Sequence, residues 1–337
     1  MTNNATKLHA HRAAAVLASA AVAGALIATG PAAAQPNKSW PTKTVRIIVP
    51  FAPGSATDLV PRAVFEQVQQ QTGQTFVIEN RAGGGTITGT VAVSKAEPDG
   101  YTLLVHSNGF VTTPPLQANS PYDPVRDFAG VTPLAAVPMV LVISPAKKIK
   151  TLQELVAYAK ANPGKLNYAA AGLGTPPHLT MERLRVAAGF TGQVVPFKGA
   201  PEAVTEVLAG RVDVYFSPLP PAVQLIESGQ LVPLAVSSLQ RVAALPNVPT
   251  TTEAGFPNSD FDFYSSLFVP KQTPRDVVAR IHEVTLKGMQ SPIMKERFQK
   301  LGVEPLSMTP EAFDARIAKE AKIAVELAVA TGLAKSQ

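Results

Sequence analysis

The sequence predicts an α/β protein of two domains with a ligand cleft between them. Short apolar, β-branched runs alternate with helix-like segments from residue 44 onward, an order typical of parallel sheets covered by helices. The chain of 337 residues is long enough for about two such domains. After a last strand-like run at 263–269 the pattern is only helical, and those helices need an earlier sheet to cover. We therefore expect the chain to cross between the domains twice, near residues 138–143 and 262–268.

The predicted elements assign residues 35–138 and 264–337 to a first domain and residues 139–263 to a second. In the first domain we expect strands at 45–49, 75–79, 101–106 and 263–269. Its helices are expected at 57–71, from the Gly loop at 83–85 to about residue 96, and at 274–290, 292–301 and 310–333. In the second domain we expect strands at 137–143, 166–169, 193–196, 212–216 and 231–237. Its helices are expected at 151–162, 176–188, 201–209 and 220–228, the first opened by a capping box of Thr151 and Glu154.

Residues 1–34 have the layout of a cleavable signal peptide. Lys7 and Arg12 give a basic start, residues 13–29 form an Ala-rich apolar run, and small residues at 31–34 precede Gln35. A transmembrane anchor is the alternative, but the run is short and weakly apolar. We therefore expect export to a bacterial periplasm, where a soluble protein without an anchor is retained.

Composition and motifs exclude several classes of function. The chain contains no cysteine, which excludes disulfides, zinc–thiolate sites, iron–sulfur clusters, thiol nucleophiles and a lipoprotein anchor. Without the signal segment, 28 basic residues stand against 24 acidic ones, and no basic run interleaved with aromatics indicates nucleic acid. There is no G-x-S-x-G, H-E-x-x-H or phosphate-loop motif, and the dinucleotide fingerprint that starts at Gly172 ends in Pro177. We expect no catalytic residue, cofactor or metal.

Three Gly- or Pro-rich loops, at 50–58, 80–86 and 170–177, each follow a strand and precede a helix. The first turn of a helix has unpaired N–H groups and a partial positive charge, which together suit a carboxylate or phosphate. Each loop alone also fits a plain connection, but three of them favour one anion-binding cleft. For Asp58 we favour a first-turn role that complements the helix dipole over a catalytic carboxylate. For His178 the sequence leaves open structural capping or packing on one side and ligand contact on the other. His106 is similarly open, whereas His282 is expected on the surface.

Several stretches together resemble one known family. "VPFAPGSATD", "VIENRAGGG", "ANPGKLNYAAAGLGTPPHL", "VPFKGAPEAV" and "LPNVPTTTEAGFP" follow each other in this order. The mature chain, from Trp40 to the final helix, is similar to the extracytoplasmic solute receptors of tripartite tricarboxylate transporters, the Bug receptor family. The resemblance implies a two-lobed, type II-like periplasmic-binding-protein fold that closes over a small carboxylic acid. It also implies a monomer that delivers its ligand to membrane permease subunits by transient contact. A ligand-sensing receptor for a signalling partner, using the same cleft, is the alternative.

The resemblance also implies a ligand site. In the family, backbone amides and ordered waters of the first loop hold one ligand carboxylate. The implied ligand-binding residues are Phe51, Gly54, Ser55, Ala56, Thr57, Asp58, Gly84, Gly85, Ser107, Ala170, Gly172, Thr175, His178, Phe197, Lys198 and Ser217.

This chain departs from the family pattern at four places. Ser55 and Ala56 stand where Gly-Gly is frequent, and Ala170 stands where Ser is frequent. Phe197 replaces a frequent Tyr and so removes a hydroxyl group. Ser217 stands where many members have Asp, and it has no charge to pair with a ligand ammonium. A dicarboxylate or aromatic carboxylate is therefore expected in preference to an amino acid.

Overall fold

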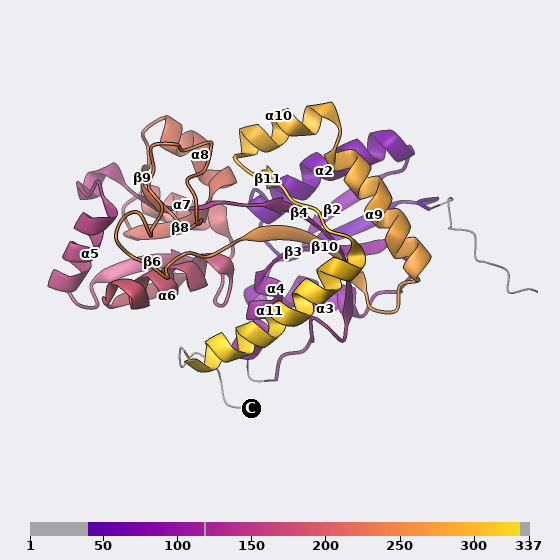
Figure 1. The fold of residues 1–337 in the computed structure, drawn as a ribbon, viewed down its shortest axis with the longest axis horizontal. Helices are drawn as coiled ribbons and strands as arrows, with labels where there is room; N and C mark the ends of the chain where they lie inside the picture. Colours follow the sequence, from indigo (N-terminus) through magenta and orange to yellow (C-terminus); the bar gives the residue numbers. More distant parts are fainter. Residues whose placement is uncertain (1–39, 118, 331–337) are drawn as a thin grey trace, which may run out of the picture. The chain divides into compact units, whose positions relative to one another are not determined.

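The structure, a computed structural model, describes residues 40–117 and 119–330. The described residues contain two β-sheets with helices packed on both (Figure 1). The signal peptide expected over residues 1–34 lies outside the described residues. The described residues belong to one compact unit. The division into domains of residues 35–138 with 264–337, and of residues 139–263, therefore stays a prediction.

The first sheet has six strands in the order β11-β4-β10-β3-β1-β2. Their bounds are β1 (Val45–Val49), β2 (Phe76–Asn80), β3 (Thr102–Ser107), β4 (Phe128–Ala136), β10 (Tyr264–Pro270) and β11 (Glu304–Pro305). β1 runs parallel to β2 and β3, as the sequence pattern predicts. The other half of the sheet is antiparallel, because β10 runs against both β3 and β4 and β11 runs against β4. The sheet is therefore mixed, and β4 and β11 are strands that the sequence pattern did not predict.

The second sheet has five strands in the order β7-β6-β8-β5-β9. Their bounds are β5 (Met139–Ile143), β6 (Leu166–Ala170), β7 (Gly192–Pro196), β8 (Val214–Pro218) and β9 (Val232–Val236). β6 is parallel to β7 and β8, whereas β5 is antiparallel to β8 and β9. The chain passes between the sheets twice, from β4 to β5 and from β9 to β10. The second passage is longer than expected, because residues 237–263 form no strand that belongs to either sheet.

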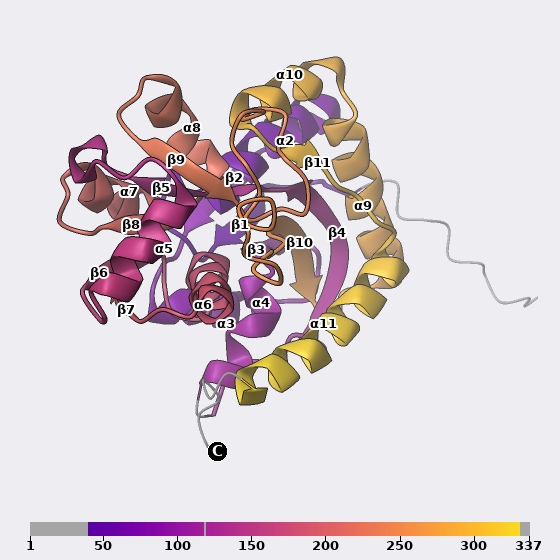
Figure 2. The same cartoon turned by 60° about the vertical axis from the view of Figure 1, so that its left-hand side comes forward.

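Helices cover both faces of the first sheet. One face packs on α2 (Ala56–Thr72), α9 (Arg275–Met289) and α10 (Pro292–Leu301), the other on α3 (Ile87–Ser94), α4 (Gly109–Thr112) and α11 (Pro310–Ala330). Successive residues of a strand point to opposite faces, and Leu103 and Leu104 of β3 accordingly join different clusters. Figure 2 shows α11 running beside β4 and α4. The C-terminal helices thus cover the first sheet, as the sequence predicts.

The second sheet packs on α5 (Leu152–Ala161), α6 (Pro176–Ala188), α7 (Ala200–Leu208) and α8 (Leu219–Glu227). The predicted capping box opens α5, since Thr151 Oγ1 accepts from Glu154 N–H and Glu154 Oε2 accepts from Thr151 N–H. None of the helices within residues 40–117 and 119–330 is both long enough and apolar enough to span a bilayer.

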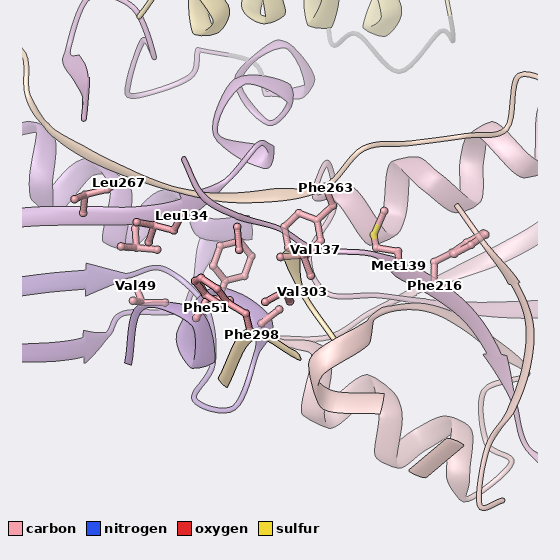
Figure 3. Packing of buried hydrophobic residues seen from close by; sticks show 14 of the residues in the cluster. Val49, Phe51, Leu134, Val137, Met139, Phe216, Phe263, Leu267, Phe298 and Val303 are labelled. Atoms are coloured by element: carbon pink, nitrogen blue, oxygen red, sulfur yellow. The ribbon is translucent and has the colours of Figure 1, made fainter. Parts of the chain in front are cut away.

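Buried apolar side chains continue from one sheet to the other along the connecting segments. Figure 3 shows Val137, Met139 and Phe263 between Leu134 of the first sheet and Phe216 of the second. All five belong to one buried cluster. Packing of this kind fixes where the two connecting segments leave their sheets, and hence where the loops at the strand ends lie.

Candidate functional site

The predicted site residues follow three neighbouring parallel strands in each sheet. In the first sheet the first loop (residues 50–58) follows β1, the second loop (80–86) follows β2, and Ser107 ends β3. In the second sheet the third loop (170–177) follows β6, Phe197 and Lys198 follow β7, and Ser217 lies near the end of β8. Carboxyl ends of parallel strands are where ligands bind in α/β sheets.

These strand ends lie against one another across the two sheets. A methyl group built on Gly199, which follows β7, would lie 2.6 Å from Cβ of Ala52 in the first loop. A methyl group built on Gly172 of the third loop would lie 3.6 Å from Cα of Gly85 in the second loop. The loops of the two sheets therefore pack closely against one another at these two places.

The start of α2 carries hydrogen-bond donors that lack acceptors. Ser55, Ala56 and Thr57 are 3%, 1% and 2% exposed. Ser55 occupies the N-cap position without a side-chain capping bond, and its Oγ is buried without a partner. Asp58 N–H and Leu59 N–H donate to the Ser55 carbonyl oxygen, but within the described residues Ala56 N–H and Thr57 N–H have no acceptor. A buried helix start without partners calls for an acceptor from outside the chain.

Asp58 holds the first loop in shape. The residue is 1% exposed, and Oδ2 accepts from Gly54 N–H at 2.8 Å. Oδ1 accepts from Asn80 Nδ2 at 2.9 Å and from Arg62 Nε at 3.0 Å. Asn80 Nδ2 also donates to the Phe51 carbonyl oxygen at 3.1 Å, which ties the second loop to the first. Both carboxylate oxygens are occupied, so Asp58 acts on the loop and has a larger role than the dipole complement that the sequence indicated.

In the second loop, Gly85 is the predicted site residue that contacts another loop. Gly84 is exposed, whereas Gly85 meets the third loop, where its methyl position lies 3.5 Å from the Leu173 carbonyl oxygen. Thr86 follows with φ of 84°, a left-handed conformation that costs a non-glycine residue about 1 kcal/mol or more. Its Oγ1 is buried without a partner. Of the two glycines predicted for the site, the structure brings only Gly85 against the other loops.

The third loop offers fewer donors than the sequence pattern suggested. Thr175 occupies the N-cap position of α6 without a side-chain capping bond, and its Oγ1 donates to the Gly172 carbonyl oxygen at 2.7 Å. Pro176 and Pro177 follow, and neither has an N–H group. The first turn of α6 therefore lacks two of the amides that make a helix start attractive to anions. The anion-binding groups are concentrated in the first loop, and the Pro-Pro pair is the sequence signal for this.

His178 makes a hydrogen bond within the third loop. Its Nδ1 accepts from Gly174 N–H at 3.1 Å, which requires a neutral ring with the proton on Nε2. Burial lowers the pKa of His178, while the nearby Glu182 carboxylate opposes that shift. The side chain is 6% exposed. The bond from Gly174 gives His178 a structural role in the third loop, and its contact with the ligand stays a prediction.

At the other predicted site residues of the second sheet, the polar groups described below already have hydrogen-bond partners within the chain. Ala170 is buried, and Phe197 N–H donates to its carbonyl oxygen at 2.7 Å. Lys198 has an exposed side chain and a backbone N–H that donates to Glu202 Oε2. Ser217 is fully buried, and its Oγ donates to the Pro218 carbonyl oxygen at 2.9 Å.

Two polar residues at the end of β3 have unpartnered acceptors. His106 is fully buried, with Nδ1 2.8 Å from the Ser107 carbonyl oxygen and Nε2 without a partner. Burial lowers the pKa of His106 to about 4. Asn108 is 8% exposed and donates from Nδ2 to the Asp262 carbonyl oxygen at 2.8 Å, while its Oδ1 is buried without a partner. The sequence left His106 open and did not single out Asn108, although a polar run that ends an apolar strand is the signal.

A cavity of about 1300 Å³ lies away from these loops. Its wall includes the connecting segments at Val137 and Phe263, Arg241, and Lys295 of α10. None of the predicted site residues lines it. Arg241 is already paired with Glu253, and no described side chain in this wall has a buried polar atom without a partner. We therefore place the candidate site at the three loops.

A match to a family model shows which protein family the chain belongs to. The model of the tripartite tricarboxylate transporter family receptors, TctC, matches residues 60–332. The chain belongs to this family. Members are solute receptors, not enzymes, so the family agrees with the resemblance found in the sequence.

Curated relatives of this receptor family match over most of the chain. A protein encoded between tcbD and tcbE in Pseudomonas sp. strain P51 is 36% identical over 279 residues, 82% of this chain and 83% of that protein. BugT of Bordetella pertussis is 34% identical over 284 residues, 84% of this chain and 87% of that protein.

Solved receptors confirm the fold. The periplasmic binding protein BugD superposes with a TM-score of 0.84 at 33% identity, covering 88% of this chain and 100% of BugD. A Rhodopseudomonas palustris protein with adipate gives 0.83 at 29% identity, over 87% and 98% of the two chains. MatC of Rhodopseudomonas palustris with bound malate gives 0.81 at 27% identity, over 85% and 99%. The predicted α/β periplasmic-binding-protein fold is therefore correct.

Proposed function

We propose that this protein is a periplasmic receptor that captures a small organic carboxylate for a tripartite tricarboxylate-type transporter. Two observations from relatives support the class of ligand, because the related structures carry adipate and malate. Related solved proteins are described as periplasmic. The proposal includes delivery to membrane permease subunits by transient contact, which follows from membership of a transporter receptor family.

The observation that carries this proposal is the buried start of α2. Ala56 N–H, Thr57 N–H and Ser55 Oγ lie within three residues, are buried, and lack partners among the described residues. A carboxylate has two oxygens that accept several hydrogen bonds. Hydrogen bonds to a charged group contribute about 1.5–3 kcal/mol each, and the helix dipole adds roughly 0.3–2 kcal/mol. These groups are therefore sufficient to bind an anion without a cationic side chain.

The opposing loops supply the means to enclose the ligand. Gly54, beside this start, has its methyl position 3.4 Å from Cγ of Pro201 at the start of α7. Gly85 and Gly172 meet in the same way between the second and third loops. A ligand bound by the first loop thus comes between elements of both sheets. Hinge closure of the two sheets around it would exclude water and strengthen its hydrogen bonds.

The opposing residues favour plain acids over amino acids. Ser217 has no charge, and its hydroxyl already donates to Pro218. Phe197 presents a half-buried ring without a hydroxyl group. A buried ligand ammonium needs a carboxylate partner, and Asp58, the acidic residue of the first loop, has both oxygens occupied. We therefore propose a dicarboxylate or an aromatic carboxylate as the ligand.

Calorimetric titration of the mature chain with succinate, malate, adipate, phthalate and aspartate tests this function. We expect at least one of the plain acids to bind and aspartate to bind more weakly. Gly54→Val should abolish binding, because Gly54 has φ of 78° and borders the donors. Gly73→Val is the matched control, since Gly73 has φ of 68° but open space around its methyl position. If no acid binds, or if both variants bind equally well, the proposed function is wrong.

A further inference from the structure

We propose that the end of β3 selects acids that carry a hydroxyl group: His106 Nε2 accepts the hydrogen of that hydroxyl while the first loop holds the carboxylate, and Asn108 Oδ1 is a second buried acceptor for a ligand donor. This inference rests on the proposed function and narrows its ligand class to small hydroxy acids. It is based on two buried acceptor atoms that the chain itself leaves unpaired.

The hydrogen-bonding state of His106 is fixed by its neighbour. Nδ1 lies 2.8 Å from the Ser107 carbonyl oxygen, which can only accept, so Nδ1 carries the proton. Nε2 is then a bare acceptor in a ring that is fully buried. The low pKa of the ring, about 4, keeps it neutral near pH 7. Such a nitrogen accepts from a hydroxyl group and has nothing to offer a second carboxylate.

The orientation of Asn108 is fixed in the same manner. Its amide nitrogen donates to the Asp262 carbonyl oxygen at 2.8 Å, so the amide cannot be reversed without losing that bond. Oδ1 is therefore the free atom, and it is buried without a donor. A buried acceptor without a donor is costly, and binding that satisfies it is favoured.

Both residues border the loops of the proposed site. The His106 ring lies 5.3 Å from the Phe51 ring of the first loop, measured between centroids. Asn108 precedes Gly109, whose methyl position lies 3.6 Å from Cα of Thr175 in the third loop. The His106 ring thus packs on the loop that supplies the donors, and the residue after Asn108 packs on the loop that faces it from the second sheet.

A hydroxyl group fits these acceptors better than an ammonium group. An ammonium would bring a charge into a buried region, and such a charge needs an anionic partner. Asp58 is fully engaged by Gly54, Asn80 and Arg62. A hydroxyl satisfies a neutral acceptor without this requirement.

The chain also offers a control residue. Ser266 of β10 lies directly opposite His106 in the strand register, and its Oγ is likewise buried without a partner. A bound water that joins Ser266 to His106 would satisfy both atoms without any ligand hydroxyl. Replacing Ser266 therefore distinguishes a direct hydrogen bond from the ligand hydroxyl to His106 from one made through a water held by Ser266.

The test is calorimetry with two acid pairs that differ by one hydroxyl, malate against succinate and 2-hydroxyglutarate against glutarate. In the wild-type protein the hydroxy acid of at least one pair should bind about tenfold more tightly or better, because its partner leaves a buried acceptor unpaired. His106→Leu should reduce that preference to about twofold or less. Ser266→Ala should retain it. Equal affinities within both pairs, a preference that survives His106→Leu, or one that disappears in Ser266→Ala would each overturn the proposal.

The imidazole nitrogens of His106 give a second readout on the wild-type protein. In ¹⁵N spectra the Nε2 resonance should shift when malate is added and stay in place when succinate is added. The same movement with both acids would contradict the inference. A failure of the proposed function is distinguishable, because then none of succinate, malate, adipate and phthalate binds at all.

Discussion

Thr112 Oγ1 donates a hydrogen bond of 2.9 Å to the carbonyl oxygen of Gly174. Thr112 ends α4, which covers the first sheet, and Gly174 belongs to the third loop of the second sheet. The bond therefore fastens the two sheets together beside the proposed ligand site. It involves no group to which we assign ligand contact, so its effect on binding acts through closure.

Thr112→Val should weaken ligand binding about three- to tenfold, because a neutral hydrogen bond contributes about 0.5–1.5 kcal/mol. The loss should appear mainly as faster dissociation, since the bond exists only when the loops meet. Stopped-flow binding kinetics measures both rates. Thr72→Val is the control, because Thr72 Oγ1 makes a similar bond of 2.8 Å to Val68 inside one helix. Equal dissociation rates in the two variants would show that the Thr112 bond has no part in closure.

Ser55→Ala should lower ligand affinity about tenfold while leaving the ligand-free free energy of unfolding unchanged or slightly higher. Ser55 makes no capping bond, so its removal loses no hydrogen bond and relieves a buried hydroxyl without a partner. Denaturant unfolding and calorimetry measure the two quantities. Thr151→Ala should behave in the opposite way, losing about 1 kcal/mol of stability from its capping box without affecting binding. A loss of stability in Ser55→Ala with unchanged affinity would assign Ser55 a purely structural role.

Asp58→Asn should weaken both binding and folding. The carboxylate accepts from Gly54, Asn80 and Arg62, and an amide cannot accept with both of its ends. We expect a loss of about 1–3 kcal/mol in unfolding free energy and a tenfold or greater loss of affinity. Asp99→Asn removes an exposed ion pair with Lys43 and should cost less than about 1 kcal/mol. If the two variants proved equally mild, Asp58 would not organise the first loop.

The free energy of unfolding should fall as the pH is lowered from about 6.5 towards 4, in part because of His106. Its folded pKa is about 4, below the value of about 6.5 of an unfolded histidine, so the unfolded state binds more protons in this window. Stability from this group is present above pH 6.5 and is lost progressively below it, by up to about 3 kcal/mol. The lowered pKa of His178 acts in the same direction. His106→Leu should have the shallower pH dependence, and identical slopes in denaturant titrations would contradict this assignment.

Local patterns predicted much of the fold, because they report local chemistry. α6 and α10 begin and end where the sequence places them, since a Pro at the first turn and a Gly after the last mark each end. β4 was missed because Gly130 and Pro133 interrupt an apolar stretch that is almost entirely buried. Pro133 is tolerated near an irregularity where β4 pairs with β10. No local pattern reveals that pairing partner, which lies more than 100 residues away.

The candidate site was predictable only in part, for a similar reason. The first loop could be located because glycine, proline and a following helix are neighbours in the sequence. The role of Asp58 depends on Asn80, 22 residues away. The free oxygen of Asn108 is defined by Asp262, 154 residues further along the chain. Which polar atoms remain unpaired depends on the whole fold. Local sequence patterns do not predict it, because the partners lie far apart in the chain.

A crystal structure of the mature protein with a bound dicarboxylate tests the central claim most directly. We expect one ligand carboxylate within about 2.7–3.2 Å of the amide nitrogens of Ala56 and Thr57, directly or through one ordered water, with the second and third loops closed over it. A ligand bound instead in the cavity of about 1300 Å³ beside α10, with those two amides still unpartnered, would contradict the account.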